Sequence, residues 1–146
     1  MTSSTNTYVV DASVGIKLVV PEAGSEHAER LFARLLDTQP ITLLVPDLFY
    51  IECANVLCKK VRRQEVSAEK ALQALATLDA LALPTTAGAQ LLMDAYQIAT
   101  RLGIWAYDAC YLALSQQAGV PLITADERLV RAAVGTFHVI SLYSLT

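Results

Sequence analysis

Two aspartates stand directly after short apolar runs, a position from which a carboxylate can take part in chemistry. Asp11 follows the run Tyr8–Val10, and Asp126 comes just after the run Pro121–Thr124. If both runs are parallel strands flanked by helices, their ends face the crevice in which such folds bind ligands. Asp11 and Asp126 are therefore candidate functional residues that could meet in one site.

Two further acids lie in segments that are otherwise apolar. Glu52 is the single acid in the stretch Leu48–Cys58, and Asp108 stands near the start of the segment YDACYLALS. An unpaired carboxylate on an apolar helix face is costly. The cost indicates that Glu52 has a role beyond solubility, and both helices are expected to begin on the side of the sheet that carries Asp11 and Asp126.

Gathered in one crevice, four carboxylates favour a metal-dependent reaction. Two carboxylates about 4 Å apart repel each other by roughly 4 kcal/mol at an effective dielectric near 20, so a cation or a proton must relieve the repulsion. The three cysteines and two histidines do not complete a zinc-binding pattern. All-oxygen ligation favours Mg²⁺ or Mn²⁺, which can activate water and hold a scissile phosphate.

The elements that must position these acids alternate between strands and helices. Apolar or β-branched runs predict strands over residues 8–10, 41–45, 81–85, 121–124 and 137–141. Helical patterns lie between them, with Ser25 and Asp47 as candidate N-caps. Gly103 and Gly119 stand where helices commonly end. The alternation predicts an α/β fold, namely a three-layer α/β/α sandwich with a mainly parallel, about five-stranded sheet, in a single domain over residues 1–146.

Composition restricts the possible partners. The net charge of −3 gives no general attraction to nucleic acid, so binding RNA would need a local basic patch or a bound cation. Although 54% of the residues are hydrophobic, there is no uncharged apolar run of about 18 residues. The N-terminus lacks the basic flank of a signal peptide. We therefore expect a cytoplasmic protein with no membrane span.

Four short motifs occur along the chain in a characteristic order. The motifs are D-A-S at 11–13, E-x-x-N at 52–55, Y-D-A-x-Y-L-A-L at 107–114 and L-I-T-A-D-E-R-L at 122–129, so they are distributed over most of the chain without filling it. In this order and at these spacings, the motifs resemble the PIN-domain family, and specifically the VapC-type toxins of toxin–antitoxin pairs. No acid of the family pattern is missing from the sequence.

The resemblance implies which residues bind metal and which support them. The metal-binding and catalytic acids would be Asp11, Glu52, Asp108 and Asp126. The supporting polar residues would be Ser13, Asn55 and Thr124. We hypothesise that Asp11 and Asp108 are the main metal ligands and that Glu52 orients or deprotonates the attacking water. Asp126 would complete the cluster directly or through water.

The resemblance also implies an activity and partners. The activity would be endoribonuclease cleavage of phosphodiester bonds with Mg²⁺ or Mn²⁺, with tRNA or another structured RNA as the usual substrate. The protein would be a toxin silenced by a cognate antitoxin protein, and commonly a homodimer. A binding or scaffold module with the same fold and a dormant centre is the alternative. A receiver or phosphatase is disfavoured, because no lysine follows Lys70 and Asp11 lacks a D-x-D pairing.

Simpler structural roles stay open for several of these residues. Asp126 could be only a helix N-cap, and Asp108 only an acid favoured by a helix N-terminus. The hydroxyls of Ser13 and Thr124 could likewise serve as helix caps.

Two groups of residues, one basic and one aromatic, have either an RNA-binding role or a purely structural one. Lys59 and Arg63 continue at helical spacing from Glu52, so they could guide RNA to the site, or they could simply be solvated cations near a helix C-terminus. Four aromatic residues could stack bases but are more typical of a core or a dimer interface. These are Trp105, Tyr50, Tyr107 and Tyr111.

Overall fold

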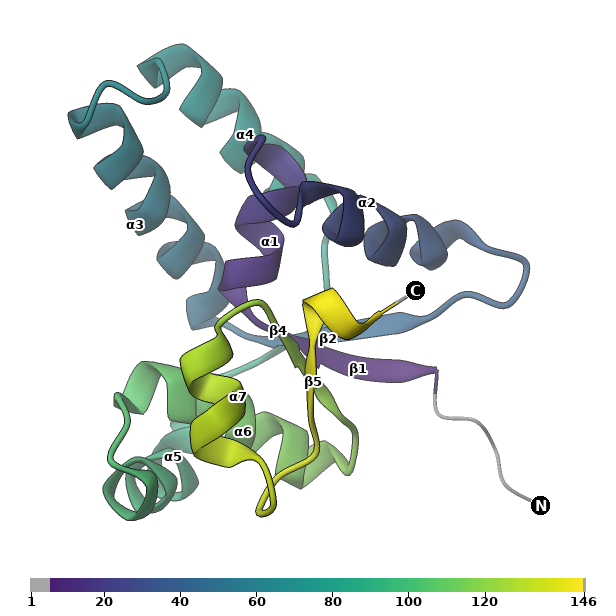
Figure 1. The fold of residues 1–146 in the computed structure, drawn as a ribbon, viewed down its shortest axis with the longest axis vertical. Helices are drawn as coiled ribbons and strands as arrows, with labels where there is room; N and C mark the ends of the chain where they lie inside the picture. The colour runs from purple at the N-terminus through teal and green to yellow at the C-terminus, as the bar shows by residue number, and fades with distance from the viewer. Residues whose placement is uncertain (1–5, 146) are drawn as a thin grey trace.

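The computed structural model describes residues 6–145, and residues 1–5 and 146 lie outside the described part. Its centre is a sheet of five strands in the order β3-β2-β1-β4-β5 (Figure 1). The strands are β1 (Thr7–Val10), β2 (Thr42–Pro46), β3 (Thr85–Thr86), β4 (Leu122–Thr124) and β5 (Val139–Ser141). Every pairing is parallel, so the predicted mainly parallel, five-stranded sheet is confirmed.

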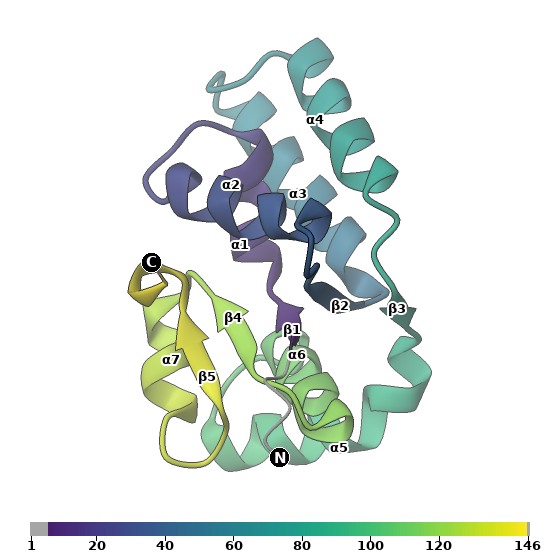
Figure 2. The ribbon, with the colours of Figure 1, turned by 90° about the vertical axis from the view of Figure 1, so that its right-hand side faces the viewer.

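Helices cover both faces of this sheet. One group packs on one face: α1 (Ala12–Val19), α2 (Ser25–Ala33), the 3₁₀ turn η1 (Arg34–Leu36), α3 (Leu48–Arg62) and α4 (Ala68–Ala80). The later elements are α5 (Gly88–Leu102), α6 (Ala106–Ala118), α7 (Glu127–Ala133) and the 3₁₀ turn η2 (Leu142–Ser144). Figure 1 shows α1–α4 above the sheet and α5–α7 below it, and Figure 2 shows the same separation from the side. The three-layer α/β/α architecture is therefore confirmed.

The strand order places a crevice beside the end of β1. From β1 the chain moves outward through β2 and β3, and then returns to add β4 and β5 on the other side of β1. Val9, Val10 and Ile123 in the two central strands are fully buried, as expected for parallel strands covered on both faces. Ligand sites in such sheets lie at the carboxyl ends of the strands where the order reverses, which here is the boundary between β1 and β4.

A glycine allows α1 to pack closely against α3. A Cβ atom added to Gly15 would lie 2.6 Å from Cζ of Phe49, closer than real Cβ atoms approach a neighbour. Phe49 and Cys53 are fully buried in this contact region. The close approach holds the N-terminal half of α3, which carries Glu52, beside the helix that follows β1.

Two helices end at the glycines that the sequence predicted as helix ends. Gly103 ends α5 at a φ of +67°, and Gly119 ends α6 at a φ of +68°. Both angles are in the left-handed region, which glycine adopts at low cost. The turn at Gly103 leads directly into α6 and so helps to place Asp108.

Three local predictions are wrong or need correction. The third strand covers only Thr85–Thr86 instead of 81–85, because Leu81 ends α4 and Ala82 has a φ of +47°. Ser25 is not an N-cap: Gly24 occupies that position, and the Ser25 hydroxyl donates to the carbonyl of Val20.

Asp47 stands at the N-cap position of α3 but does not cap that helix with its side chain. Its Oδ1 instead accepts a hydrogen bond of 3.1 Å from the backbone N–H of Gly88, at the start of α5.

Among residues 6–145 there is no helix that is both long and apolar enough to cross a membrane.

Candidate active site

Asp11 lies at the carboxyl end of β1 and is almost completely buried, with 5% of its surface exposed. Its backbone N–H donates to the carbonyl of Ile123, which ties the end of β1 to β4. The carboxylate oxygen Oδ2 accepts two hydrogen bonds of 2.7 Å, one from Ser13 Oγ and one from Thr124 Oγ1. The two hydroxyls favour the charged form of a carboxylate that burial would otherwise neutralise.

The same two hydroxyls are themselves held by the backbone that follows β4. Ser13 Oγ accepts a hydrogen bond of 3.0 Å from the N–H of Ala125, and Thr124 Oγ1 accepts one of 3.0 Å from the N–H of Asp126. Each hydroxyl has one proton, which it gives to Asp11. Ser13 and Thr124 therefore link the end of β1 to the loop that carries Asp126, and neither acts as a helix cap.

Glu52 lies in the second turn of α3 and is half-buried. Its Oε1 accepts a hydrogen bond of 2.6 Å from the hydroxyl of Tyr111, which is fully buried in α6. This bond joins helices from opposite faces of the sheet. Because a buried phenol keeps few rotamers, the bond fixes the position of the Glu52 carboxylate.

Asp108 and Asp126 share one side of the site. Asp108 lies in the first turn of α6, and Asp126 is the N-cap of α7, where its Oδ1 accepts from the N–H groups of Arg128 and Leu129. Both acids line a cavity of about 200 Å³ together with Trp105 and Arg128. The capping role of Asp126 is confirmed, and it coexists with a position beside Asp108.

Burial and neighbouring carboxylates raise the pKa values of three of the acids, Asp11, Glu52 and Asp108. Burial, followed by the negative charges of Asp11 and Asp108, raises the pKa of Glu52 from an ordinary 4.5 to about 7. Burial, followed by Asp11 and Asp126, raises the pKa of Asp108 from 3.8 to about 6. The pKa of Asp11 is raised by burial against the lowering effect of its two hydroxyl partners, and the charge of Asp126 raises it further.

These shifts predict how the stability of the metal-free protein depends on pH. A carboxyl group whose pKa is raised by folding binds more protons in the folded than in the unfolded state, so stability falls as pH rises through the interval between the two values. For Glu52 the interval runs from 4.5 to about 7. In EDTA, the thermal midpoint of wild type should therefore decrease between about pH 5 and about pH 7.5.

The contribution of Glu52 can be isolated by substitution. Glu52→Gln keeps an acceptor for Tyr111 but cannot ionise, so its thermal midpoint should decrease less over the same pH range. Glu69→Gln, at an exposed position in α4, serves as the matched control and should follow wild type. Equal slopes for wild type and Glu52→Gln would show that Glu52 is not under electrostatic strain.

The donor set is compatible with a hard divalent cation. All four acids carry oxygen atoms of the kind that such a cation binds, and burial together with neighbouring negative charge raises the pKa values of Asp11, Glu52 and Asp108. Among residues 6–145, no three His, Cys, Asp or Glu side chains are arranged so that they could enclose a metal ion. Mg²⁺ does not need such an enclosure, since it commonly takes one or two carboxylates and keeps several waters.

Tyr111 is a residue whose role the sequence did not reveal. Its interpretation as a core aromatic is confirmed by its complete burial, but its hydroxyl is also the partner of Glu52. Removing the hydroxyl should raise the pKa of Glu52 further, because a hydrogen bond to the charged form is lost. Tyr111→Phe should therefore shift the acidic limb of the pH–rate profile upward by about one unit and lower activity near pH 7 about fivefold, the decrease in the charged fraction of Glu52.

A second tyrosine provides a matched control for that experiment. Tyr50 is half-buried, and its hydroxyl accepts a hydrogen bond from the N–H of Leu83, away from the acids. Tyr50→Phe should alter stability without moving the pH–rate profile. An unchanged profile in Tyr111→Phe would mean that Tyr111 only fills space.

The remaining predicted residues lie farther from the acids. Asn55, Lys59 and Arg63 are exposed. At 1.5 Å per residue, Lys59 is about 10 Å and Arg63 about 16 Å along α3 from Glu52. Asn55 makes no side-chain hydrogen bond to the four acids in the part of the chain that the structure describes. Its supporting role, and the RNA-guiding role of the two cations, stay predictions.

Two aromatic residues contradict the expectation of a core position. Trp105 is 77% exposed and Tyr107 is 64% exposed. Trp105 is the N-cap residue of α6 and lines the cavity that contains Asp108. Trp105 and Arg128 were not assigned to the site by sequence motifs, although each lies within three residues of one of its acids.

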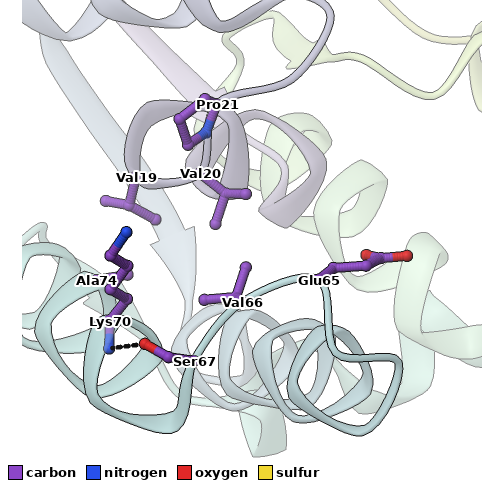
Figure 3. Close-up of a pocket in the computed structure, with 8 residues that line it drawn as sticks. All are labelled: Val19, Val20, Pro21, Glu65, Val66, Ser67, Lys70 and Ala74. Atoms are coloured by element: carbon purple, nitrogen blue, oxygen red, sulfur yellow. Dashed lines mark hydrogen bonds between the residues drawn. The ribbon is translucent and has the colours of Figure 1, made fainter.

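A larger cavity elsewhere in the molecule does not contain the acids. It has a volume of about 410 Å³ and lies between the end of α1 and the start of α4. Figure 3 shows Val19, Val20 and Pro21 facing Val66, with Lys70 at the rim. Its lining is partly apolar and contains a single acid, Glu65, so the candidate active site is the smaller crevice that contains Asp108 and Asp126.

The fold and the site together define an α/β/α protein with an acidic crevice where the strand order of a parallel sheet reverses. The family model for the PIN domain matches residues 8–135. The chain is also 37% identical over 123 residues to ribonuclease VapC3 of Pyrobaculum aerophilum, which covers 83% of this chain and 90% of the relative. The chain therefore belongs to the PIN-domain family, and the predicted VapC-type resemblance is confirmed.

Solved structures agree with this assignment at the level of the fold. The crystal structure of PAE2754 from Pyrobaculum aerophilum has a TM-score of 0.69 at 22% identity, with 94% of this chain and 92% of the other covered. A toxin–antitoxin complex from Klebsiella pneumoniae has a TM-score of 0.61 at 16% identity, with 94% and 99% covered.

Proposed function

We propose that this protein is a metal-dependent endoribonuclease, and that it is the toxin of a type II toxin–antitoxin pair. The observation that carries the proposal is the electrostatic coupling of carboxylates from separate segments of the chain: Asp11 acts on both Glu52 and Asp108, and Asp126 shares a cavity with Asp108. Burial, followed by these neighbouring charges, raises the pKa values of Glu52 and Asp108, and this supports a bound cation as the missing charge. We place the activity in a single nuclease domain acting in the cytoplasm.

Asp11 and Asp108 are the proposed ligands of Mg²⁺ or Mn²⁺, and Asp126 would complete the cluster directly or through water. When bound, the ion would supply Lewis-acid activation of water and neutralise charge on the scissile phosphate. The two hydrogen bonds from Ser13 and Thr124 to Oδ2 favour the charged form of Asp11 against the opposing effect of burial. A charged Asp11 is required because a protonated carboxyl is a poor ligand.

Glu52 is the proposed acceptor of the proton from the attacking water. Its pKa of about 7 is close to the value at which a general base works best near neutral pH. Tyr111 is a positioning residue in this scheme, since its hydroxyl holds Glu52 Oε1. Binding of a cation nearby would favour the charged form of Glu52 and so make it a competent base.

The similarity to a protein named as a ribonuclease supports RNA as the substrate. The fold shared with the toxin–antitoxin complex of Klebsiella pneumoniae supports an antitoxin protein as a partner. We further propose a homodimer and a structured RNA, such as tRNA, as the target.

The proposal is tested by incubating total cellular RNA with purified protein and Mg²⁺ or Mn²⁺. Discrete fragments should appear with wild type and be absent with Asp108→Asn or EDTA. Total RNA is the appropriate substrate because a selective enzyme would ignore most single oligonucleotides. Intact RNA in every lane, from folded protein free of co-purified antitoxin, would instead favour a binding module with a dormant centre.

The two exposed cations of α3 give a further prediction. We expect Lys59 and Arg63 to contact backbone phosphates of RNA that extends beyond the active site. The double variant Lys59→Glu and Arg63→Glu should weaken RNA binding and reduce the slope of log K against log salt by about two. Arg30→Glu and Arg131→Glu, at exposed positions in α2 and α7, provide a control with the same change in net charge. An RNA affinity and salt slope equal to those of wild type would eliminate the RNA-guiding role.

A further inference from the structure

We propose that Trp105 and Arg128 form a substrate subsite beside the four acids. In this subsite the indole of Trp105 stacks on one unpaired nucleobase adjacent to the scissile phosphate, and the guanidinium of Arg128 contacts a backbone phosphate. The inference rests on the proposed ribonuclease function and specifies which feature of RNA the site recognises.

The geometry places both side chains on the wall of the acidic cavity. Trp105 precedes Asp108 by one helical turn, and Arg128 follows Asp126 at the start of α7. All four residues line the same cavity of about 200 Å³. A group that contacts Asp108 through a cation is therefore within reach of the indole and the guanidinium.

The exposure of Trp105 is informative because an indole is normally buried. Leaving 77% of it in water forgoes the hydrophobic stabilisation that burial would provide. The cavity it lines is shared with two carboxylates and an arginine, so an aliphatic protein surface would have to desolvate those charges. A nucleobase attached to its phosphate matches both parts of the wall, since its ring has a π-face and its phosphate is anionic.

Arg128 is free to interact with a phosphate. Its side chain is 87% exposed, and its Nε is 3.9 Å from Asp126 Oδ1. Such an exposed ion pair is weak and exchanges readily. The guanidinium lowers the pKa of Asp108, which places its positive charge near the proposed metal ligand, and its planar donors suit phosphate oxygens.

The subsite would select unpaired RNA. In a duplex both faces of each base are covered by neighbours, so stacking on Trp105 requires the base to leave the helix. Bases in loops and bulges have no such cost. Cleavage should therefore occur at or beside an unpaired nucleotide, even when the target RNA is largely folded.

The chain contains a single tryptophan, so fluorescence excited at wavelengths that tyrosine does not absorb reports on Trp105 alone. The test titrates Glu52→Gln protein in Mg²⁺, which prevents turnover, with oligo(A), oligo(U) and their duplex, each about 20 nucleotides long to exceed one binding site. Single strands should quench the fluorescence, and the duplex should quench it much less. Unchanged fluorescence at RNA concentrations that saturate binding by anisotropy would overturn the subsite.

Substitutions then distinguish an effect on base stacking from an effect on the structure of the protein. Measured with labelled oligo(A) in the same background, Trp105→Ala should bind about 5- to 150-fold more weakly, the range for losing one base–aromatic stack. Trp105→Phe should retain most of the affinity, and Arg128→Ala should reduce the salt slope by about one. Tyr96→Ala removes an aromatic ring that is 63% exposed on α5 and is the matched control.

Failure of the subsite and failure of the nuclease are distinguishable. Wild-type cleavage of total RNA that persists unchanged in Trp105→Ala, with no quenching by single strands, would overturn the subsite alone. Quenching without any cleavage by wild type would support the subsite and contradict the nuclease. Fluorescence that changes with protein concentration but not with RNA would also overturn the subsite, since it would place Trp105 between two copies of the chain.

Discussion

Asp11→Asn should abolish RNA cleavage while leaving the folded protein as stable as wild type or more stable. Asp11 is the most buried of the four acids, and its raised pKa shows that its charge is unfavourable in the metal-free fold. Asparagine keeps an oxygen that can accept from Ser13 and Thr124 but cannot supply a negative ligand. Losing several kcal/mol of metal-derived transition-state stabilisation corresponds to a decrease of roughly 10³-fold in rate.

The stability half of this prediction distinguishes a functional from a structural carboxylate. If Asp11 mainly held β1 and β4 together, Asp11→Asn would lower the thermal midpoint. If it is retained for metal binding, the midpoint in EDTA at neutral pH should stay equal or rise, because a buried charge is removed. Asp37→Asn, at an exposed position after η1, is the control for both assays. Full cleavage by Asp11→Asn would refute the assignment of Asp11 as a ligand.

Mg²⁺ or Mn²⁺ should both restore cleavage after EDTA treatment and raise the thermal midpoint. A cation that binds only the folded state stabilises it by RT ln(1 + [L]/Kd), which is about 1.4 kcal/mol at ten times Kd. For a chain of this length that corresponds to an increase of about 3–6 °C. The increase should be larger at pH 7.5 than at pH 5, because the acids are then ionised more fully.

The thermal shift needs a control for general salt effects. NaCl at matched ionic strength screens the carboxylates without occupying a site, so it should produce a smaller increase. Asp11→Asn should lose most of the specific increase caused by Mg²⁺ or Mn²⁺. An equal shift in wild type and Asp11→Asn would show that the cations act by screening alone, and cleavage that survives EDTA would contradict metal dependence itself.

The positions of the strand-end acids could be predicted from sequence because they follow from local patterns. A buried parallel strand is a continuous apolar run, so Val9 and Val10 marked β1 and placed Asp11 at its end. The alternation with helices then required a parallel sheet, and carboxyl ends of parallel strands share one edge. The same logic placed Glu52 and Asp108 in helices that begin at that edge.

Local patterns were less informative where two conformations compete over a few residues. The segment 81–85 is apolar enough for a strand, but α4 extends to Ala80 and leaves only Thr85–Thr86 to pair. Ser25 suits an N-cap, yet Gly24 takes that position at a φ of +94°, and Ser25 hydrogen-bonds back to Val20 instead. In each case, the contacts of neighbouring elements decided between alternatives of similar local energy.

Sequence alone therefore determined the α/β class, the parallel sheet and the strand-end positions of Asp11 and Asp126, because hydrophobic periodicity and strand ends are properties of neighbouring residues. Only the tertiary structure decided that Tyr111 donates to Glu52 across 59 positions, and that Thr124 donates to Asp11 across 113. It also decided that Trp105 is exposed at the acidic cavity rather than buried. Hydrogen-bond partners and solvent exposure depend on which elements pack together, and that information is distributed over the whole chain.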